Sequence, residues 1–299
     1  MKILVIGSSN TDMVIQAPRL PARGETILGG QFVMNPGGKG ANQAVAATRL
    51  GGKVRLLTKV GDDLFGQQTI SRLKNEGILT DYVLIDSRYP SGVALITVDE
   101  GGENTIVVAS GANMALGEKE ILVLMNPIEQ ATIILLQLEI PLQTVELAAK
   151  TASNLGKTVI LNPAPAYPLS DSLLSKISIL TPNQTEAQML TGIKVNSPET
   201  ADLAAQHLHK KGVANVIITL GKEGAYLCNE QTTQLIPGYP VEAVDTTAAG
   251  DTFNGALAVA LLEGKELIEA ISFANLAASL SVTRLGAQSS IPYRYELEC

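Results

Sequence analysis

Residues 245–256 bring together small residues, acids and a helix start in a pattern suited to phosphoryl transfer. Ala248, Ala249 and Gly250 are small enough to leave backbone N–H groups uncovered where a helix is expected to begin. Such N–H groups, together with the positive end of the helix dipole, bind anions such as phosphate. Asp251 lies at the same helix start and has the chemistry of a general base toward an alcohol. The segment therefore predicts an anion hole at 248–251 with Asp251 as the base.

A capping role is the simpler interpretation of Asp251. Aspartate is among the residues preferred at helix N-caps, so a lone acid at a helix start does not by itself indicate catalysis. The glycine-rich approach, the second acid Asp245 and Gly255, which permits close helix packing, favour the catalytic interpretation. Because a helix N-terminus favours the ionised form of a carboxyl group, we expect Asp251 to be a weak base.

Amide and carboxylate side chains elsewhere have the chemistry needed to select one hydroxyl of a sugar. These are Asn10, Asp12, Asn42 and Glu139, and Gly38 permits close approach of the backbone. A substrate lacking a hydroxyl would leave such buried partners unpaired, which discriminates strongly between sugars. Each side chain also has a structural interpretation, as a turn residue, a helix-start amide or a strand-end acid. The residues alone leave both interpretations open.

Two familiar nucleotide-binding signatures fail on inspection. Gly156-Lys157-Thr158 ends like a Walker A loop, but Thr151 occupies the position of its first glycine. Gly38-Lys39-Gly40 begins like a dinucleotide fingerprint, but Gln43 occupies the position of its last glycine. The sequence therefore argues against a P-loop enzyme and against a Rossmann oxidoreductase.

Composition excludes several classes of protein. The 299 residues are 45% hydrophobic and 17% charged, as in a folded globular protein. A net charge of −7 argues against a nucleic-acid or membrane-surface binder. Cys228 and Cys299 form no C-x-x-C pair, which argues against a disulfide scaffold or a cysteine zinc site. With no signal-peptide pattern and no apolar stretch of membrane-spanning length, we expect a cytoplasmic protein.

Short apolar runs alternate with helical patterns along most of the chain. The expected strands are Ile3–Ile6, Val54–Val60, Ile133–Leu138, Val159–Leu161, Ile177–Leu180 and Val216–Leu220. The expected helices are Gly40–Leu50, Phe65–Glu76, Leu142–Leu155, Thr185–Leu190, Thr200–Lys211, Gly250–Leu262 and Leu267–Val282. Strands that are apolar throughout are typical of parallel sheets covered on both faces. This order predicts a doubly wound α/β fold with a mostly parallel central sheet flanked by helices.

Two regions, at about residues 12–35 and 92–110, contain strand patterns without helices between them. The strands expected there are Met13–Ile15, Thr26–Val33, Val93–Val98 and Thr105–Val108. They predict a small separate β-sheet that acts as a lid and shields the site from water. We expect residues 1–299 to form one domain that carries this lid.

Four ordered motifs resemble the ribokinase-like carbohydrate kinase family over nearly the whole chain, from Gly7 to Pro292. Residues 245–255 match its C-terminal signature, D-T-x-x-A-G-D-x-F-x-G, and residues 37–44 match its N-terminal signature. Residues 183–186 match N-x-x-E, and residues 219–224 match T-x-G-x-x-G. The one departure is Ala248-Ala249-Gly250-Asp251 in place of G-A-G-D, and the family tolerates alanine at the first position. Residues 162–166 and 283–288 also resemble family segments.

The resemblance implies a set of site residues. The sugar would be bound by Asn10, Asp12, Gly38, Lys39, Gly40, Asn42, Glu139 and Asp251. The nucleotide would be bound by Asn183, Thr219, Gly221, Lys222, Gly224, Gly250 and Asn275, with Glu186 near Mg²⁺ through water. A potassium ion would take oxygen ligands from Asp245, Thr247, Ser281, Arg284, Gly286 and Ser290, largely through backbone carbonyls.

The resemblance also implies the reaction and the assembly. Within the family it is strongest to members that transfer phosphate from MgATP to the 5-hydroxyl of D-ribose. Kinases of 2-deoxyribose or fructose use much of the same residue set and remain alternatives. A non-catalytic sugar sensor is a further alternative, but it should have lost Asp251 or Gly250, and both are present. A homodimer formed through the lid is expected.

Overall fold

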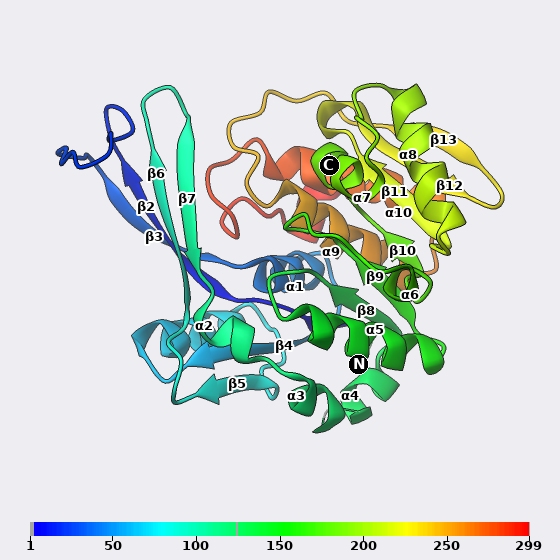
Figure 1. Cartoon of the computed structure of the whole chain (residues 1–299), viewed down its shortest axis with the longest axis horizontal. Coiled ribbons are helices and arrows are strands. Elements are labelled where there is room, and N and C mark those ends of the chain that lie inside the picture. The colour runs from blue at the N-terminus through cyan, green and yellow to red at the C-terminus, as the bar shows by residue number, and fades with distance from the viewer. Residues whose placement is uncertain (1–2, 124, 299) are drawn as a thin grey trace.

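The computed structural model describes residues 3–123 and 125–298. Its main sheet has nine strands in the order β13-β12-β11-β10-β9-β8-β1-β4-β5 (Figure 1). Their bounds are β1 Ile3–Ile6, β4 Val54–Gly61, β5 Val83–Asp86, β8 Ile133–Leu136, β9 Thr158–Leu161, β10 Ile179–Leu180, β11 Asn215–Thr219, β12 Gly224–Asn229 and β13 Thr233–Pro237. The strands from β5 to β11 pair in parallel, which confirms the predicted fold class.

Side chains of the central strands alternate between two apolar layers. In β1, Ile3 and Val5 belong to one buried cluster, whereas Leu4 and Ile6 belong to the other. The first cluster is completed by α1, α9 and α10, and the second by α5, α7 and α8. Because both faces are covered by helices, the strands are apolar throughout, as the sequence indicated.

The helices follow the predicted order. They are α1 Lys39–Arg49, α2 Leu64–Asn75, α3 Glu118–Val123, α4 Met125–Gln130, α5 Leu142–Asn154, α6 Asp171–Leu174, α7 Gln184–Thr191, α8 Pro198–Lys210, α9 Ala249–Leu262 and α10 Leu267–Ser281, with 3₁₀ turns η1 Gly111–Ala115, η2 Gly221–Glu223 and η3 Arg294–Leu297. The three short helices α3, α4 and α6 were not predicted, because each is too short for a periodic pattern. Within the described ranges, no helix has the length and apolarity required to cross a bilayer.

The sheet differs from the prediction at its two edges. β12 and β13 form an antiparallel hairpin on β11, and β5 lies at the opposite edge. None of these three strands was predicted. Edge strands bury less of their surface, so β13 and β5 lack the continuous apolar run that marks the central strands.

A second sheet, which we call the lid sheet, has four strands in the order β3-β2-β6-β7 and extends away from the main sheet (Figure 1). Its strands are β2 Asn10–Gln16, β3 Phe32–Gly37, β6 Gly92–Val98 and β7 Asn104–Ala109. The prediction of a strand over Thr26–Val33 was wrong, since the strand begins at Phe32. Gly29 and Gly30 interrupt the run before it, and pairing with β2 carries the strand on to Gly37, directly before α1.

Candidate active site

The start of α9 presents unpaired backbone donors. Ala248, its N-cap, has φ of 60° and makes no side-chain cap. The N–H of Ala249 donates to the carbonyl of Thr246 at 3.2 Å, whereas the N–H groups of Ala248, Gly250 and Asp251 have no acceptor within the described residues. Three of the four predicted anion-hole donors are therefore available, at the positive end of a 14-residue helix.

A small polar cavity lies against this helix start. Its volume is about 180 Å³, and its lining includes Lys39, Asn183, Glu186, Thr219, Gly250 and Asp251. A Cβ built on Gly250 meets no heavy atom within 4 Å, so this glycine faces open space. The cavity thus brings together free N–H donors, a lysine and two carboxylates.

Asp251 is buried and does not cap its helix. Its two carboxylate oxygens accept hydrogen bonds from Asn42 Nδ2 at 2.9 Å and from Gln43 Nε2 at 3.0 Å. The capping interpretation of Asp251 is therefore wrong. The side chain is instead fixed by two amides of α1, which packs against α9 at the close approach of Gly255.

Burial changes the acidity of Asp251. It raises the pKa of Asp251 above the ordinary value, while Lys39 and the amides of Asn42 and Gln43 act in the opposite direction. This direction is opposite to the one expected from the helix start alone, because removal from water disfavours the charged form of the carboxyl group. A raised pKa makes this carboxylate a stronger base.

The sugar-side residues gather around the junction of the main sheet and the lid sheet. Glu139 Oε2 accepts from Ser8 Oγ at 2.5 Å and from the backbone N–H of Lys39 at 3.0 Å. Burial, reinforced by the charges of Glu139 and Asp251, raises the pKa of Asp12 to about 6. Asp12, Lys39, Glu139 and Asp251 therefore lie close enough to interact electrostatically, although they come from four separate segments of the chain.

Two of the predicted glycines are required by close backbone contacts. Gly38 has φ of 88°, and a Cβ there would lie 2.6 Å from the backbone nitrogen of Asn10. A Cβ on Gly40 would lie 2.6 Å from the backbone nitrogen of Ser8. These contacts bring the start of α1 against the start of β2 and account for both glycines.

Lys39 is surrounded by carboxylates. Asp251, Glu139, Glu186 and Asp12 all raise the pKa of its ammonium group, in that order, against the lowering effect of burial. Within the described part of the chain, Lys39 makes no ion pair within 4 Å and its Nζ donates no hydrogen bond. Its charge is therefore available to a ligand.

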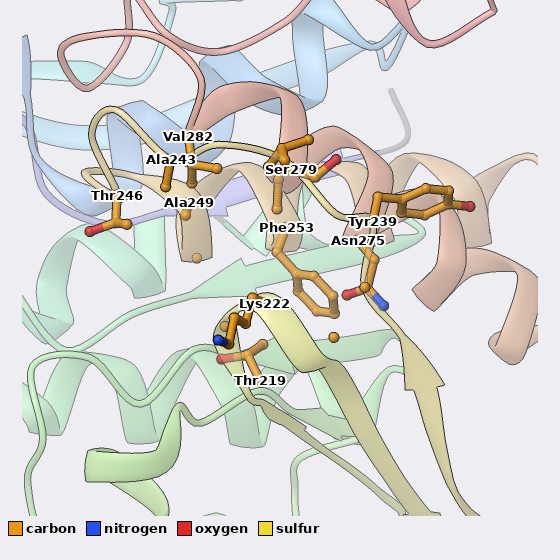
Figure 2. A pocket seen from close by; sticks show the side chains of 16 residues that line it. Thr219, Lys222, Tyr239, Ala243, Thr246, Ala249, Phe253, Asn275, Ser279 and Val282 are labelled. Carbon is orange, nitrogen blue, oxygen red and sulfur yellow. The ribbon is translucent and has the colours of Figure 1, made fainter.

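Six of the seven predicted nucleotide residues line a larger cavity of about 230 Å³, shown in Figure 2, and the seventh, Asn183, lines the smaller one. Thr219, Gly221, Lys222, Gly224, Gly250 and Asn275 all contribute to its lining. Asn275 Nδ2 donates to the carbonyls of Ile236 and Pro237, at 3.2 and 3.1 Å, which ties α10 to β13. Thr219 and Gly250 line both cavities, so the two are adjacent.

Asn183 and Glu186 form a capping box at the start of α7. Asn183 Oδ1 accepts from the N–H of Glu186, and Glu186 Oε2 accepts from the N–H of Asn183, both at 2.8 Å. Both residues also line the 180 Å³ cavity, and burial raises the pKa of Glu186. The capping interpretation and a ligand-binding role are compatible here.

In the described residues, no group of three or more His, Cys, Asp or Glu is placed to hold a metal ion.

The residues predicted to hold a monovalent cation lie in two loops that meet. Asp245 Oδ1 accepts from Thr247 N at 2.9 Å, and its Oδ2 accepts from Gly286 N at 2.8 Å. The hydroxyls of Ser281 and Ser290 donate within their own turns, to Ala278 and Ala287. The side chain of Arg284 pairs with Glu296, so only its backbone remains for such a role.

Several residues of the site had no predicted role. Gln43, Gln137, Asn162 and Gln288 form side-chain hydrogen bonds that lead to Asp251 or Asn42. Asn113 holds Asn10 in the same way. Gln43, Asn162 and Gln288 lie in segments that resemble the family, whereas Gln137 and Asn113 are marked only as amides between apolar residues.

Comparisons with known proteins identify the family of this chain. A family model described as pfkB family carbohydrate kinase matches residues 1–294. The chain is 48% identical over 294 residues to the ribokinase of Haemophilus influenzae, covering 98% of this chain and 96% of that protein. It is 40% identical over 293 residues to the deoxyribokinase of Salmonella typhimurium, covering 98% and 96%. A structure of Arabidopsis thaliana ribokinase complexed with ribose and ATP matches with a TM-score of 0.92 at 35% identity, covering 99% of this chain and 97% of that one. The chain therefore belongs to the pfkB family of carbohydrate kinases.

Proposed function

We propose that this protein transfers the γ-phosphoryl group of ATP to the 5-hydroxyl of D-ribose, giving D-ribose 5-phosphate and ADP. The observation that carries the proposal is the buried carboxylate of Asp251 beside unpaired N–H groups at the start of α9. The relatives named ribokinase, and the neighbour complexed with ribose and ATP, support the choice of substrates.

In the proposed reaction, Asp251 accepts the proton of the 5-hydroxyl as its oxygen attacks the γ-phosphorus. The new O–P bond forms while the bond to the β–γ bridging oxygen breaks, and ADP leaves with that electron pair. The N–H groups of Ala248, Gly250 and Asp251 stabilise the charge on the transferred oxygens. The raised pKa of Asp251 suits this role.

Magnesium would enter with the nucleotide. The free polar cavity at Asn183 and Glu186 offers amide and carboxylate oxygens, which are the ligands that hard divalent cations prefer. Glu186 would contact the ion through water, since both its oxygens already accept hydrogen bonds from Asn183. When bound, Mg²⁺ offsets the charge of the phosphates.

An assay of ADP release with a panel of pentoses and hexoses tests the proposed function. We expect ribose to give the highest kcat/KM, and mass spectrometry and phosphorus NMR to identify ribose 5-phosphate as the product. A higher kcat/KM with 2-deoxyribose or fructose would overturn the ribose assignment. Sugar binding without ADP release would favour a non-catalytic sensor.

We predict that potassium raises activity. The carboxylate of Asp245 and the carbonyls around residues 281–290 form an oxygen-rich loop pair, and Asp245 sits six residues before the base. A bound cation would hold these loops and so fix the anion hole. Initial rates in a sodium-free Tris buffer should increase by about tenfold between zero and saturating KCl, with choline chloride as the ionic-strength control. A flat response would contradict the prediction.

We propose that the lid sheet also forms a homodimer interface. Cross-strand register places Phe32, Met34, Leu95 and Val107 on the face opposite Asp12, and all four are exposed. Such an apolar face on an open sheet needs a partner. We infer that each chain forms one domain and that its lid sheet also joins it to a second chain.

Light scattering coupled to size-exclusion chromatography tests the proposed dimer. The wild-type mass should be about twice the 31.4 kDa of one chain. Leu95→Glu should give a monomer, because a charge on this face cannot be paired in the interface. Leu122→Glu, at an equally exposed site on α3, is the matched control. A monomeric wild type at micromolar concentration would contradict the proposal.

A cytoplasmic location is also proposed. Cys228 is a free, buried thiol, and burial raises the pKa of Cys228, which keeps it protonated and unreactive. Free thiols are usual in reducing compartments, where ATP is also available. Fractionation of the native host, with the protein detected by antibody, tests this location.

A further inference from the structure

Asn113, in η1 directly after the lid sheet, is almost completely buried, at 1% exposure, and all its hydrogen bonds are formed. Its Oδ1 accepts from the backbone N–H of Ser9 at 2.9 Å. Its Nδ2 donates both to the carbonyl of Ser9 at 3.1 Å and to Oδ1 of Asn10 at 2.8 Å. No other side chain bonds the amide of Asn10 within the described residues.

These contacts fix the orientation of two side-chain amides, first that of Asn113 and, through it, that of Asn10. Ser9 offers one backbone donor and one backbone acceptor, and these cannot exchange roles, so the Asn113 amide has only one orientation that satisfies both. That orientation aims Nδ2 at Asn10, which must then turn its Oδ1 toward Asn113. The Nδ2 of Asn10 has no acceptor in the described chain and is the half of the amide left for a ligand.

We infer that Asn113 is a positioning residue for substrate recognition, which makes Asn10 a hydrogen-bond donor toward the sugar. The inference rests on the proposed function, because it requires Asn10 to contact the sugar. Asp12 lies two residues after Asn10 on β2, so the two side chains share one face of the strand. A hydroxyl that accepts from Asn10 and donates to Asp12 satisfies both, whereas two acceptors would compete for its single hydrogen.

Gly92 provides a separate observation for the same contact. A Cβ at this first residue of β6 would lie 2.2 Å from Asn10 Oδ1 and 2.3 Å from Asn113 Nδ2. Any side chain at position 92 would therefore break the hydrogen bond between them. Asn10 begins β2, Gly92 begins β6 and Asn113 follows β7, so three connections between the lid sheet and the main domain meet at this bond.

A double-mutant cycle tests the inference. Asn113→Asp keeps the shape and the acceptor for Ser9 but removes the donor to Asn10. The Asn10 amide should then rotate, so that its Nδ2 faces the carboxylate introduced at position 113 and no longer the sugar. The KM for ribose should rise by about 10- to 100-fold, because one or two hydrogen bonds to the sugar are lost. The kcat and the KM for ATP should change less than threefold. In an Asn10→Ala background, Asn113→Asp should change the KM for ribose less than twofold. Asn154→Asp, exposed at the end of α5, is the control for the same chemical change.

A second variant, Gly92→Ala, disturbs the same hydrogen bond between Asn10 and Asn113 and can be used if Asn113→Asp fails to fold. Gly92→Ala should also raise the KM for ribose, and its effect should likewise vanish in the Asn10→Ala background. Additive effects in both cycles, or a fall in kcat with an unchanged KM for ribose, would overturn the positioning role. A wild-type enzyme that phosphorylates no pentose would instead overturn the proposed function, and this inference with it.

Discussion

Replacing Asp251 with asparagine is expected to lower kcat by about 10³-fold and to leave the dissociation constant for ribose within about threefold of wild type. General-base catalysis contributes about 10²- to 10⁴-fold, and the anion hole and the bound substrates would remain. Asparagine has the shape of aspartate but cannot accept the proton of the hydroxyl. Steady-state ADP release measures kcat, and calorimetry with ribose alone measures binding.

The pH dependence should change in the same variant. Because the pKa of Asp251 is raised, the base becomes protonated, and activity falls, at a higher pH than for an ordinary aspartate. Lys39 favours the ionised form of Asp251, and the charge of Glu139 opposes it. In Asp251→Asn the residual rate should lose this acidic fall, except for the part due to Asp12, whose pKa is about 6. Asp171→Asn, an exposed acid on α6, is the control. Turnover within tenfold of wild type would exclude Asp251 as the base.

The central sheet and the anion hole could be predicted because their signals are local. A buried parallel strand is a continuous apolar run, and a helix start with small residues is visible in a few consecutive positions. The edge strands had no such signal. In β13 only Ile236 is buried, and β3 contains Asn35, Pro36 and Gly37, which disfavour a strand unless a partner such as β2 holds them.

The contacts that fix the site could not be predicted, because they join residues far apart in the chain. Gln43 and Asp251 are 208 positions apart, and Asn113 and Asn10 are 103 apart. In the sequence, Gln43 broke a dinucleotide fingerprint and lay within the N-terminal family signature, and neither observation gave its side chain a role. The burial of Asp251, which reverses its expected acidity, likewise arises from the packing of α1 on α9 and is absent from the local pattern.

Replacing Lys39 with methionine is expected to lower kcat/KM by about 10²- to 10³-fold. Lys39 is the first residue of α1, where a positive charge is unfavourable next to the helix N-terminus, and it lies among four carboxylates. Methionine keeps the length and packing of the side chain but leaves Asp251, Glu139, Glu186 and Asp12 without a compensating cation. These acids would then repel the triphosphate and the charge that develops on the transferred phosphoryl group.

Lys39→Arg and Lys150→Met separate this electrostatic role from a loss of packing. Lys39→Arg keeps the positive charge and should recover at least about a tenth of the wild-type kcat/KM, because the Coulomb attraction to the phosphates is retained. Lys150→Met, on the exposed face of α5, should behave as wild type. Because the four carboxylates lose the cation that offsets their charges, the thermal midpoint of Lys39→Met should not exceed that of wild type. A Lys39→Met enzyme with kcat/KM within tenfold of wild type would show that the N–H groups at the start of α9 suffice to neutralise the phosphate.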